Sequence, residues 1–368
     1  MKRRIISCDC LIIGAGVSGV AAGVEASRKG LKTIILEKNV FPGGTAVIAM
    51  HRYLCGVNPK IKGILKEIVK ELACGKKLLR MGRVRVLSFK TEDLVKCLQK
   101  FIRKEKNLAI IYKTKAISVK IENSRIVLVT AQASNGQLKI YPKVVIEATG
   151  SGEIIKLSKA KYNLQAPEKR QLSGLSIKVN GLKNNLSLLN IKVPYYIKFG
   201  NFYPGERKGE GFIKFSVSAS KSLSSRRYAA AKFAYLKKML PEFEGSYITK
   251  ISPEIQDREG IRLLGEYVLT KKDVLKARKF PDPAARGNWP IEFWHPRYGP
   301  KLEYLNPGEY YDIPERCLKS KNIVNLIATG RCISATPEAL ASTRVMGTCI
   351  SLGQAAGNLA SKICKGEN

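Results

Sequence analysis

Few side chains in this sequence of 368 residues can exchange protons near neutral pH, because it contains only two histidines. His295 lies in the segment PIEFWHP, and His51 follows the segment GGTA in AMHRY. An imidazole titrates close to neutral pH, so both residues are candidates for a general acid or base. For His295 the alternative is a structural side chain that caps a turn.

Three arginines are the candidates for binding an anion. Arg258 and Arg262 share the segment DREGIRLLGEY, and Arg344 lies close to the C-terminal end. A guanidinium can bind a carboxylate or a phosphate through two parallel hydrogen bonds. The alternative is that these arginines pair with the neighbouring carboxylates of Glu259 and Glu266, as structural ion pairs do.

A glycine-rich turn near the N-terminus indicates what these side chains would act beside. Gly14, Gly16 and Gly19 form the pattern GxGxxG between an apolar strand and a helix. The first glycine permits a tight turn, the second lets a pyrophosphate approach the backbone, and the third lets helix and strand pack closely. A second apolar strand ends at Glu37, whose carboxylate is placed to accept hydrogen bonds from ribose hydroxyls. The combination predicts a dinucleotide site at the helix N-terminus.

The segments after Glu37 differ from a nicotinamide-binding fold, which would continue into another βαβ unit. Gly43 and Gly44 bring the chain close to a ligand again. Residues 60–77 and 92–104 are predicted to be basic amphipathic helices. Three short alternating runs with the turn SNGQ follow, and then the apolar strand KVVIEATG. A helical pair, a small β-meander and a returning strand are typical of the insertion in a flavin-binding domain.

The net charge is unusually positive, with 65 Lys and Arg against 29 Asp and Glu, a formal net charge of +36. Residues 60–125 alone hold 19 basic and 6 acidic side chains. Such an excess attracts polyanions, including nucleic acid. The favoured interpretation is a set of solvated basic faces, because no run of five consecutive like charges occurs and aromatic residues are sparse among the lysines.

The remaining composition indicates a reducing compartment and no transmembrane span. The nine cysteines include no CxxC pair, and Cys8 and Cys10 are expected to be small buried side chains of one strand. We therefore expect a cytoplasmic protein. The basic and apolar N-terminal residues resemble a signal peptide, but the GxGxxG pattern explains the same residues better.

Three blocks of sequence resemble the FAD-dependent oxidoreductases of the glutathione-reductase-type fold, and more closely the group related to the flavin subunit of heterodisulfide reductase. The first runs from LIIGAGVSGVAAG through LEK to PGGTA, and the second is VVIEATGSGEI. The third includes PIEFWHP, YDIPERCL and NLIATGRCISATPEALASTRVMGTCISLGQAAGNLA. Cysteine clusters that hold iron–sulfur centres in some relatives are absent from the sequence, so we expect no cluster and no other metal.

The resemblance implies where the cofactor lies. The chain would return to the dinucleotide domain at its end, with Gly330 under the pyrophosphate and the last helix aimed at the flavin ring. The positive end of that helix would stabilise negative charge on the reduced ring. His295, Arg262, Arg344 and His51 would be catalytic, with His295 exchanging a proton as hydride moves at flavin N5. The implied cofactor-binding residues are Gly14, Gly16, Ser18, Gly19, Glu37, Lys38, Gly43, Gly44, Thr45, Ala116, Gly150, Gly330, Val345, Met346, Gly347 and Thr348.

The stretch of small residues from 339 to 357 has a specific expected cause. We expect small residues there because the backbone itself must contact the cofactor. Gly347→Val would then reduce the affinity for FAD or shift the potential of the flavin, while the fold largely survives. Gly357→Ala should be mild, because a helix tolerates alanine better than glycine.

The predicted fold class is α/β: a Rossmann-type FAD-binding domain with a β-meander and an inserted α+β substrate domain. The boundaries are residues 1–154, 155–300 and 301–368, with the last segment returning to the FAD domain. Strands are expected at 174–182 and 211–220, and a basic helix at 221–240. The acidic pair that follows ATG in relatives is reduced here to Glu153.

The function expected from the resemblance is hydride transfer between flavin N5 and a small, anionic organic substrate. The electron partner can be a quinone, a carrier or oxygen, and the sequence does not choose among them. Two alternatives remain open. One is an FAD-containing RNA-binding or tRNA-modifying protein, and the other is a lipid (isoprenoid) reductase at a membrane surface.

Overall fold

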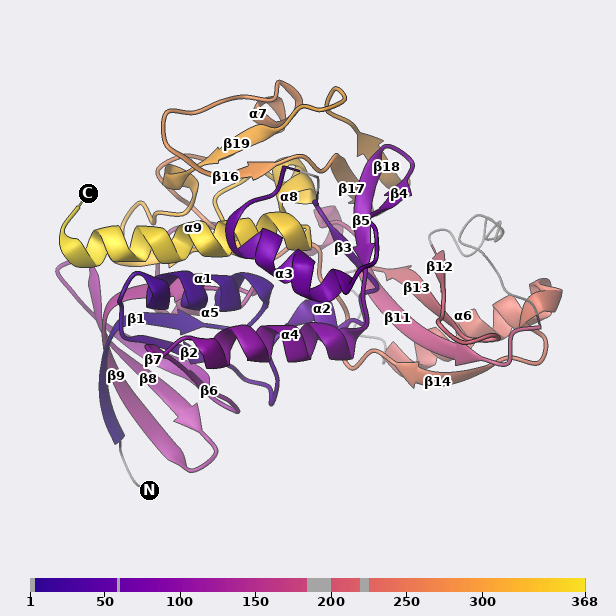
Figure 1. The fold of residues 1–368 in the computed structure, drawn as a ribbon, viewed down its shortest axis with the longest axis horizontal. Helices are drawn as coiled ribbons and strands as arrows, with labels where there is room; N and C mark the ends of the chain where they lie inside the picture. The colour runs from indigo at the N-terminus through magenta and orange to yellow at the C-terminus, as the bar shows by residue number, and fades with distance from the viewer. Residues whose placement is uncertain (1–3, 58–59, 184–199, 219–224, 368) are drawn as a thin grey trace.

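The computed structural model describes residues 4–57, 60–183, 200–218 and 225–367. Its largest sheet has a parallel part in the order β6-β2-β1-β9-β20, and β8 and β7 join β9 as an antiparallel meander (Figure 1). Strands from both ends of the chain thus share one sheet, which confirms the predicted α/β architecture of Rossmann type. The bounds are β1 Arg4–Ile13, β2 Thr33–Leu36, β6 Leu108–Ile111, β7 Lys115–Glu122, β8 Arg125–Ala133, β9 Gly136–Glu147 and β20 Leu326–Ala328.

The N-terminal βαβ unit forms as the sequence predicts. β1 and β2 run parallel up to the pair Ile13 and Leu36, and helix α1 (Val17–Arg28) connects them. Gly14 has a φ of +101°, which side-chain-bearing residues rarely adopt. A Cβ on Gly19 would lie 2.0 Å from the carbonyl oxygen of Gly14. Both glycines are therefore required by the turn and by the contact between helix and strand.

Strand β9 joins two segments that the sequence predicted as separate strands. Its first half pairs with β8 as far as Ile140, and its end pairs with β20 from Val145. Pro142 does not interrupt the strand, because its fixed φ is compatible with extended backbone. The meander and the parallel core consequently share one continuous strand.

The predicted helical pair is present, although its first helix is shorter than expected. Helix α3 ends at Ala73, and the next two residues, Cys74 and Gly75, have positive φ values of 42° and 85°. Residues 76–77 therefore lie outside it. The strands β4 and β5 that follow α3 form, with β3 before it, an antiparallel sheet that the sequence analysis missed. The bounds are α2 Thr45–Ile48, α3 Gly63–Ala73, α4 Thr91–Lys104, β3 Tyr53–Cys55, β4 Leu79–Met81 and β5 Val84–Ser88.

A second sheet, in the order β12-β13-β11-β14, forms a separate lobe with helix α6 on one face (Figure 1). Its own apolar cluster extends from Leu175 to Ile255, which agrees with the predicted α+β insertion. Residues 261–313 instead contribute to the apolar clusters of the larger lobe. The first part of the predicted helix, 221–224, lies outside the described residues. The bounds are β11 Ser173–Asn180, β12 Gly200–Pro204, β13 Gly211–Val217, α6 Ser225–Met239 and β14 Tyr247–Ile251.

The C-terminal small residues form two helices, α8 (Pro337–Thr343) and α9 (Met346–Lys365), and α9 lies along α1 (Figure 1). A Cβ on Gly353 would lie 2.1 Å from the carbonyl oxygen of Ser18. A Cβ on Gly357 would lie 2.5 Å from Ala22 O on α1, so the close packing does not support the expectation that Gly357→Ala is mild. The small residues in this part of α9 permit the contact with α1.

Short elements complete the described chain. None of its helices is long and apolar enough to cross a membrane. The pairs β10–β15, β16–β19 and β17–β18 are two-stranded and antiparallel. The bounds are α5 Glu153–Leu157, β10 Tyr162–Asn163, β15 Arg262–Leu263, α7 Lys271–Leu275, β16 Pro283–Gly287, β17 Ile291–His295, β18 Gly299–Glu303 and β19 Tyr311–Pro314.

Candidate active site

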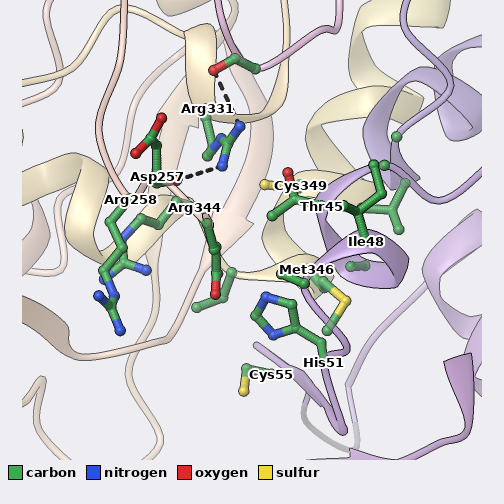
Figure 2. A pocket seen from close by; sticks show the side chains of 18 of the residues that line it. Thr45, Ile48, His51, Cys55, Asp257, Arg258, Arg331, Arg344, Met346 and Cys349 are labelled. Atoms are coloured by element: carbon green, nitrogen blue, oxygen red, sulfur yellow. Dashed lines mark hydrogen bonds between the residues drawn. The ribbon is translucent and has the colours of Figure 1, made fainter. Parts of the chain in front are cut away.

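A cavity of about 1000 Å³ lies between the carboxyl ends of the parallel strands and the sheet of the smaller lobe. Arg258, Arg331 and Arg344 line it on one side, with Thr45, Ile48 and Met346 opposite and His51 and Cys55 nearby (Figure 2). The predicted site residues that line it are Gly14, Gly16, Ser18, Glu37, Lys38, Gly43, Gly44, Thr45, His51, Gly150, Gly330, Arg344, Val345 and Met346.

One end of the cavity, here called the dinucleotide end, is built by the turn before α1. Gly16 precedes the helix, no side chain caps the first turn, and that turn contains no acidic residue. Its free N–H groups and partial positive charge are suited to a phosphate. A Cβ on Gly16 would have only the carbonyl oxygen of Ala148 within 4 Å, at 3.9 Å. The protein's own packing therefore does not require glycine here, whereas a closely approaching ligand would.

Glu37 closes the same end at the carboxyl terminus of β2. Its carboxylate is buried and accepts hydrogen bonds from Ala15 N at 2.7 Å and from Asn39 N at 2.9 Å. Asn39 Nδ2 donates a third, at 2.7 Å. These bonds fix the carboxylate beside the glycine turn, where the fingerprint predicts a ribose.

Two further loops approach the glycine turn. A Cβ on Gly44 would lie 3.1 Å from Gly16 Cα, so these backbones nearly touch. Arg331, which the sequence analysis did not select, follows Gly330 and donates to the carbonyl oxygens of Gly150 at 3.3 Å and Asp257 at 2.6 Å. Its guanidinium adds positive charge beside the dinucleotide end and connects the two lobes.

The loop after β9, which includes Gly150, is supported by a buried carboxylate that the sequence analysis also missed. Glu147 accepts hydrogen bonds from Thr149 N and Thr149 Oγ1, at 2.7 and 2.5 Å, and from Ile154 N at 2.8 Å. Burial raises its pKa from 4.5 to about 6, although these donors oppose the shift. Glu147 directly precedes the segment ATG at the end of an apolar strand, and this position could have identified it from the sequence.

Several predicted site residues are placed elsewhere by the structure. A Cβ on Gly347 would lie 2.4 Å from Gly56 O, so this glycine permits contact with the chain after β3. The reason given above for a glycine at 347, contact with the cofactor, is therefore not supported. The predicted site residues that do not line the cavity are Gly19, Ala116, Arg262, His295, Gly347 and Thr348.

His295 and Arg262 have the structural roles that were the alternatives to catalysis: His295 caps a turn, and Arg262 forms an ion pair. His295 Nδ1 accepts hydrogen bonds from Arg297 N at 3.1 Å and Tyr298 N at 3.2 Å, within the turn between β17 and β18. Arg262 pairs with Glu259 at 3.5 Å, and both side chains are buried. Neither residue faces the cavity, so a catalytic role for them is not supported.

Another part of the cavity, here called the anion end, contains Arg258, which is buried, and Arg344, which is half-buried. Arg258 packs over the Trp294 ring, with its Cζ 4.1 Å from the ring centroid, and donates to Leu172 O. Arg344 lies at the break between α8 and α9 and donates to Glu292 O at 2.9 Å. Neither guanidinium forms an ion pair within 4 Å among the described residues, contrary to the predicted alternative of pairing with Glu259 and Glu266.

Glu292 is an acidic residue of the anion end. Its carboxylate oxygens accept hydrogen bonds from Trp289 Nε1 at 3.0 Å and Trp294 Nε1 at 2.8 Å. Burial raises its pKa, but Arg344, the two indoles and Arg258 outweigh this effect and hold the pKa below its usual range. The ionised form of Glu292 is therefore favoured, and its single negative charge offsets only part of the positive charge of Arg258 and Arg344.

Two basic groups in the cavity favour their neutral forms. Burial and the nearby charges of Lys214 and Arg258 lower the pKa of His51 well below its usual value. Burial and Arg258 likewise lower the pKa of Lys214, against the opposing effect of Glu292. Lys214 was not selected from the sequence. Its position on the polar face of an alternating strand was the signal that could have identified it.

A family model described as FAD dependent oxidoreductase matches residues 9–186 and 210–367 of this chain. The chain belongs to the family of FAD-dependent oxidoreductases. FAD is the cofactor that defines this family, so the predicted enzyme class and cofactor are confirmed at this level. The uncapped start of α1 and the space at Gly16 are consistent with FAD at the dinucleotide end.

Known structures share the fold at low sequence identity. A geranylgeranyl bacteriochlorophyll reductase-like protein of Thermoplasma acidophilum is 14% identical, with a TM-score of 0.53 over 98% of this chain and 79% of that one. The OxyS anhydrotetracycline hydroxylase of Streptomyces rimosus is 12% identical, with a TM-score of 0.60 over 98% and 62%. A flavoprotein/dehydrogenase of Cytophaga hutchinsonii is 15% identical, with a TM-score of 0.57 over 98% and 80%.

One curated relative matches this FAD-dependent oxidoreductase over a short segment. The 4-oxocyclohex-2-ene-1-carboxylate 5-dehydrogenase of Sinomonas cyclohexanicum is 40% identical over 48 residues. That segment is 13% of this chain and 8% of the relative, so this chain matches only a small part of the relative's length.

Proposed function

We propose that this FAD-dependent oxidoreductase transfers hydride between flavin N5 and a small organic anion. The observation that carries the proposal is the continuity of one cavity from the glycine turn to Arg258 and Arg344, which form no ion pair within 4 Å among the described residues. When bound, FAD supplies the group that accepts or returns the hydride. The residues of the chain bind the two partners and arrange charge around them.

The dinucleotide end supplies the cofactor contacts in this proposal. The first turn of α1 binds the pyrophosphate through backbone N–H groups, and Glu37 accepts from the ribose. The start of α9 presents a second uncapped helix end at Val345 and Met346, whose partial positive charge stabilises an anionic ring. The proposed FAD-binding residues are Gly14, Gly16, Ser18, Glu37, Lys38, Gly43, Gly44, Thr45, Gly150, Gly330, Arg331, Val345 and Met346.

The anion end selects the substrate. Arg258 is desolvated and has no carboxylate partner within 4 Å among the described residues, and burial followed by the charge of Arg344 lowers its pKa. An anion that enters between the two guanidinium groups replaces the lost hydration with charge-assisted hydrogen bonds. The dehydrogenase that matches a short segment of this chain is named for a carboxylate substrate, which is compatible with this class. The grouping with the heterodisulfide reductase flavin subunit stays a prediction.

Benzoate titration of the FAD-reconstituted protein tests both ends of the cavity. We expect a flavin absorbance band after reconstitution, and a change in that band on addition of benzoate. Arg258→Gln and Arg344→Gln should each weaken benzoate binding about 10-fold or more, because a hydrogen bond to a charged group contributes about 1.5–3 kcal/mol. Their FAD content should match the wild type.

Arg297→Gln is the matched control, because Arg297 is exposed and does not line the cavity. Absence of a flavin band after reconstitution would contradict the proposed cofactor site. Unchanged benzoate affinity in both cavity variants, with the fold intact by circular dichroism, would contradict the proposed anion end.

The RNA and membrane alternatives are motivated by the net charge of +36 and are separately testable. A tRNA-binding function predicts affinity that falls steeply and log-linearly with salt. A lipid reductase at a membrane surface predicts co-sedimentation with anionic liposomes. Neither result is required by hydride transfer to a small anion.

A further inference from the structure

Lys214 is placed in the cavity by the alternation of β13. Its neighbours Ile213 and Phe215 point into the apolar cluster of the smaller lobe, so Lys214 occupies the opposite face of the strand. Across the sheet it pairs with Ser176 on β11 and Asn201 on β12. Both of these residues also line the cavity. Strand β13, one of the two inner strands of the smaller lobe, therefore presents an amine toward the anion end.

The ammonium group of Lys214 has no carboxylate within 4 Å among the described residues, which distinguishes it from Lys178 of the neighbouring strand, paired with Glu210. Arg258 and Arg344 oppose a positive charge on it, and Glu292 favours one. The titratable and charged groups of the cavity around it are His51, Cys55, Tyr203, Arg258, Glu292 and Arg344.

An incoming anion would therefore favour the charged form of Lys214. Without an anion, burial and the two guanidinium groups favour the neutral amine. An anion bound between Arg258 and Arg344 offsets their positive charge and adds a favourable interaction with a protonated Lys214. By linkage, the anion and the proton then increase each other's affinity.

We propose that Lys214 supplies the proton when the substrate is reduced, and that the substrate's own carboxylate, bound between Arg258 and Arg344, causes Lys214 to take up this proton. The inference rests on the proposed function, because it uses the same anion end. It adds the class of substrate: a carboxylate that also carries a reducible C=X bond, where X is oxygen, nitrogen or carbon.

The atoms and electrons of this step balance. The substrate carbon gains a hydride from the reduced flavin of the family, and the electron pair of the C=X π bond moves to X. X gains the proton as the N–H bond at Lys214 Nζ breaks, so the substrate is reduced, the flavin is oxidised and Lys214 becomes neutral. Oxidation reverses the step, with Lys214 as the proton acceptor.

The other titratable groups are less suited to this role. Both carboxylate oxygens of Glu292 accept indole hydrogen bonds, and its lowered pKa makes the protonated form scarce. The thiol of Cys55 is held neutral, since burial raises its pKa to about 12. His51 is the main alternative proton donor, because it is also a basic group in the cavity whose pKa is lowered. The experiment must therefore separate Lys214 from His51.

Calorimetric titration with benzoate measures the proposed coupling without turnover. The FAD-loaded protein is titrated at about pH 8, where benzoate is fully ionised, in two buffers of different ionisation enthalpy. The difference in binding heat gives the number of protons that the protein takes up. We expect net uptake of up to one proton in the wild type and none in Lys214→Met or Lys214→Arg. The arginine variant should keep its affinity within about threefold, because it retains the positive charge.

Two controls assign the proton to Lys214. Lys250→Met removes an exposed lysine from β14 of the same sheet and should retain the wild-type uptake. His51→Gln should retain it as well. Uptake that persists in Lys214→Met, or that disappears only in His51→Gln, overturns the assignment.

The outcomes also separate this inference from the proposed function. If wild-type protein binds no benzoate, the anion end itself is wrong and both proposals fall. If benzoate binds and depends on Arg258 but no proton is taken up, the proposed function stands and the role of Lys214 is refuted. FAD content measured by absorbance must be equal in all the variants compared.

Discussion

A Cβ placed on Gly357 of α9 would lie 2.5 Å from the carbonyl oxygen of Ala22 on α1. It would also lie 2.8 Å from Glu25 Cβ and 2.9 Å from Ala26 N. Two of these three atoms belong to the backbone, which cannot move aside as a flexible side chain can. The first helix and the last helix of the large lobe are therefore in direct backbone contact at this point.

Gly357→Ala should destabilise the protein, although alanine favours a helix. The added methyl group must separate α9 from α1, and overpacking of this kind costs about 1–3 kcal/mol. Chemical denaturation monitored by circular dichroism measures the change in the free energy of unfolding. Asn358→Ala, one residue further along α9 and partly exposed, should change it by less than about 0.5 kcal/mol. A Gly357→Ala protein as stable as the wild type would contradict the close contact.

Gly16→Val should weaken FAD binding while leaving the fold intact. Gly16 has a φ of −61°, which every residue tolerates, and the space around its Cβ position belongs to the cavity. The valine side chain would occupy the path of the pyrophosphate. We expect FAD affinity to fall at least about 10-fold with an unchanged far-ultraviolet spectrum.

Gly19→Val is the contrasting variant for this prediction, because its side chain would meet Gly14 O within the protein itself. It should lose stability and FAD together. Normal FAD affinity in a folded Gly16→Val protein would show that the pyrophosphate lies elsewhere.

His295→Ala should leave both binding ends unchanged and weaken only the turn between β17 and β18. The substitution removes the acceptor for two backbone N–H groups, and a hydrogen bond contributes about 0.5–1.5 kcal/mol. Thermal unfolding measures this loss, and benzoate and FAD titrations check the cavity. A 10-fold loss of benzoate affinity in a folded His295→Ala protein would restore His295 as a residue of the active site.

Glu147 should make the stability of the large lobe depend on pH in a defined direction. Its pKa is about 6 in the folded protein against 4.5 as the reference, so the folded state binds the proton more tightly. Below about pH 4.5 Glu147 makes its full contribution to the free energy of unfolding. This contribution, about 2 kcal/mol, is lost as the pH rises through about 6.

Glu147→Gln removes this titration and is the variant to compare. The free energy of unfolding of the wild type minus that of the variant should decrease between about pH 4.5 and pH 7. Denaturant titrations at several pH values measure it. A difference that is constant with pH, or that increases, would contradict the burial-raised pKa.

The sequence by itself determined the dinucleotide-binding unit. The run of buried apolar residues, the spacing of Gly14, Gly16 and Gly19, and the acid at Glu37 all act within one strand–helix–strand segment. Their roles follow from local backbone geometry: Gly14 has a positive φ, and Gly19 has no room for a Cβ. The resemblance to the FAD-dependent oxidoreductases rests on the same local patterns, and for this reason the family could be predicted.

Only the tertiary structure decided which side chains meet at the anion end. Lys214, Arg258, Glu292 and Arg344 come from β13, the segment before β15, β17 and the break between α8 and α9. His295 is as polar as these residues and lies only three positions from Glu292, yet its nitrogen is used by a turn. Sequence patterns describe the residue types, but the packing of separate lobes decides which of them face one cavity.

The tertiary structure also decided the purpose of the C-terminal small residues. Glycine at 353 and 357 fits a cofactor contact and a helix contact equally well in the sequence, because both need a missing side chain. The position of Ser18 O and Ala22 O beneath these glycines distinguishes the two causes. Helices α1 and α9 come from opposite ends of the sequence and are brought together only when the chain folds. No local sequence pattern therefore predicts the distance between them.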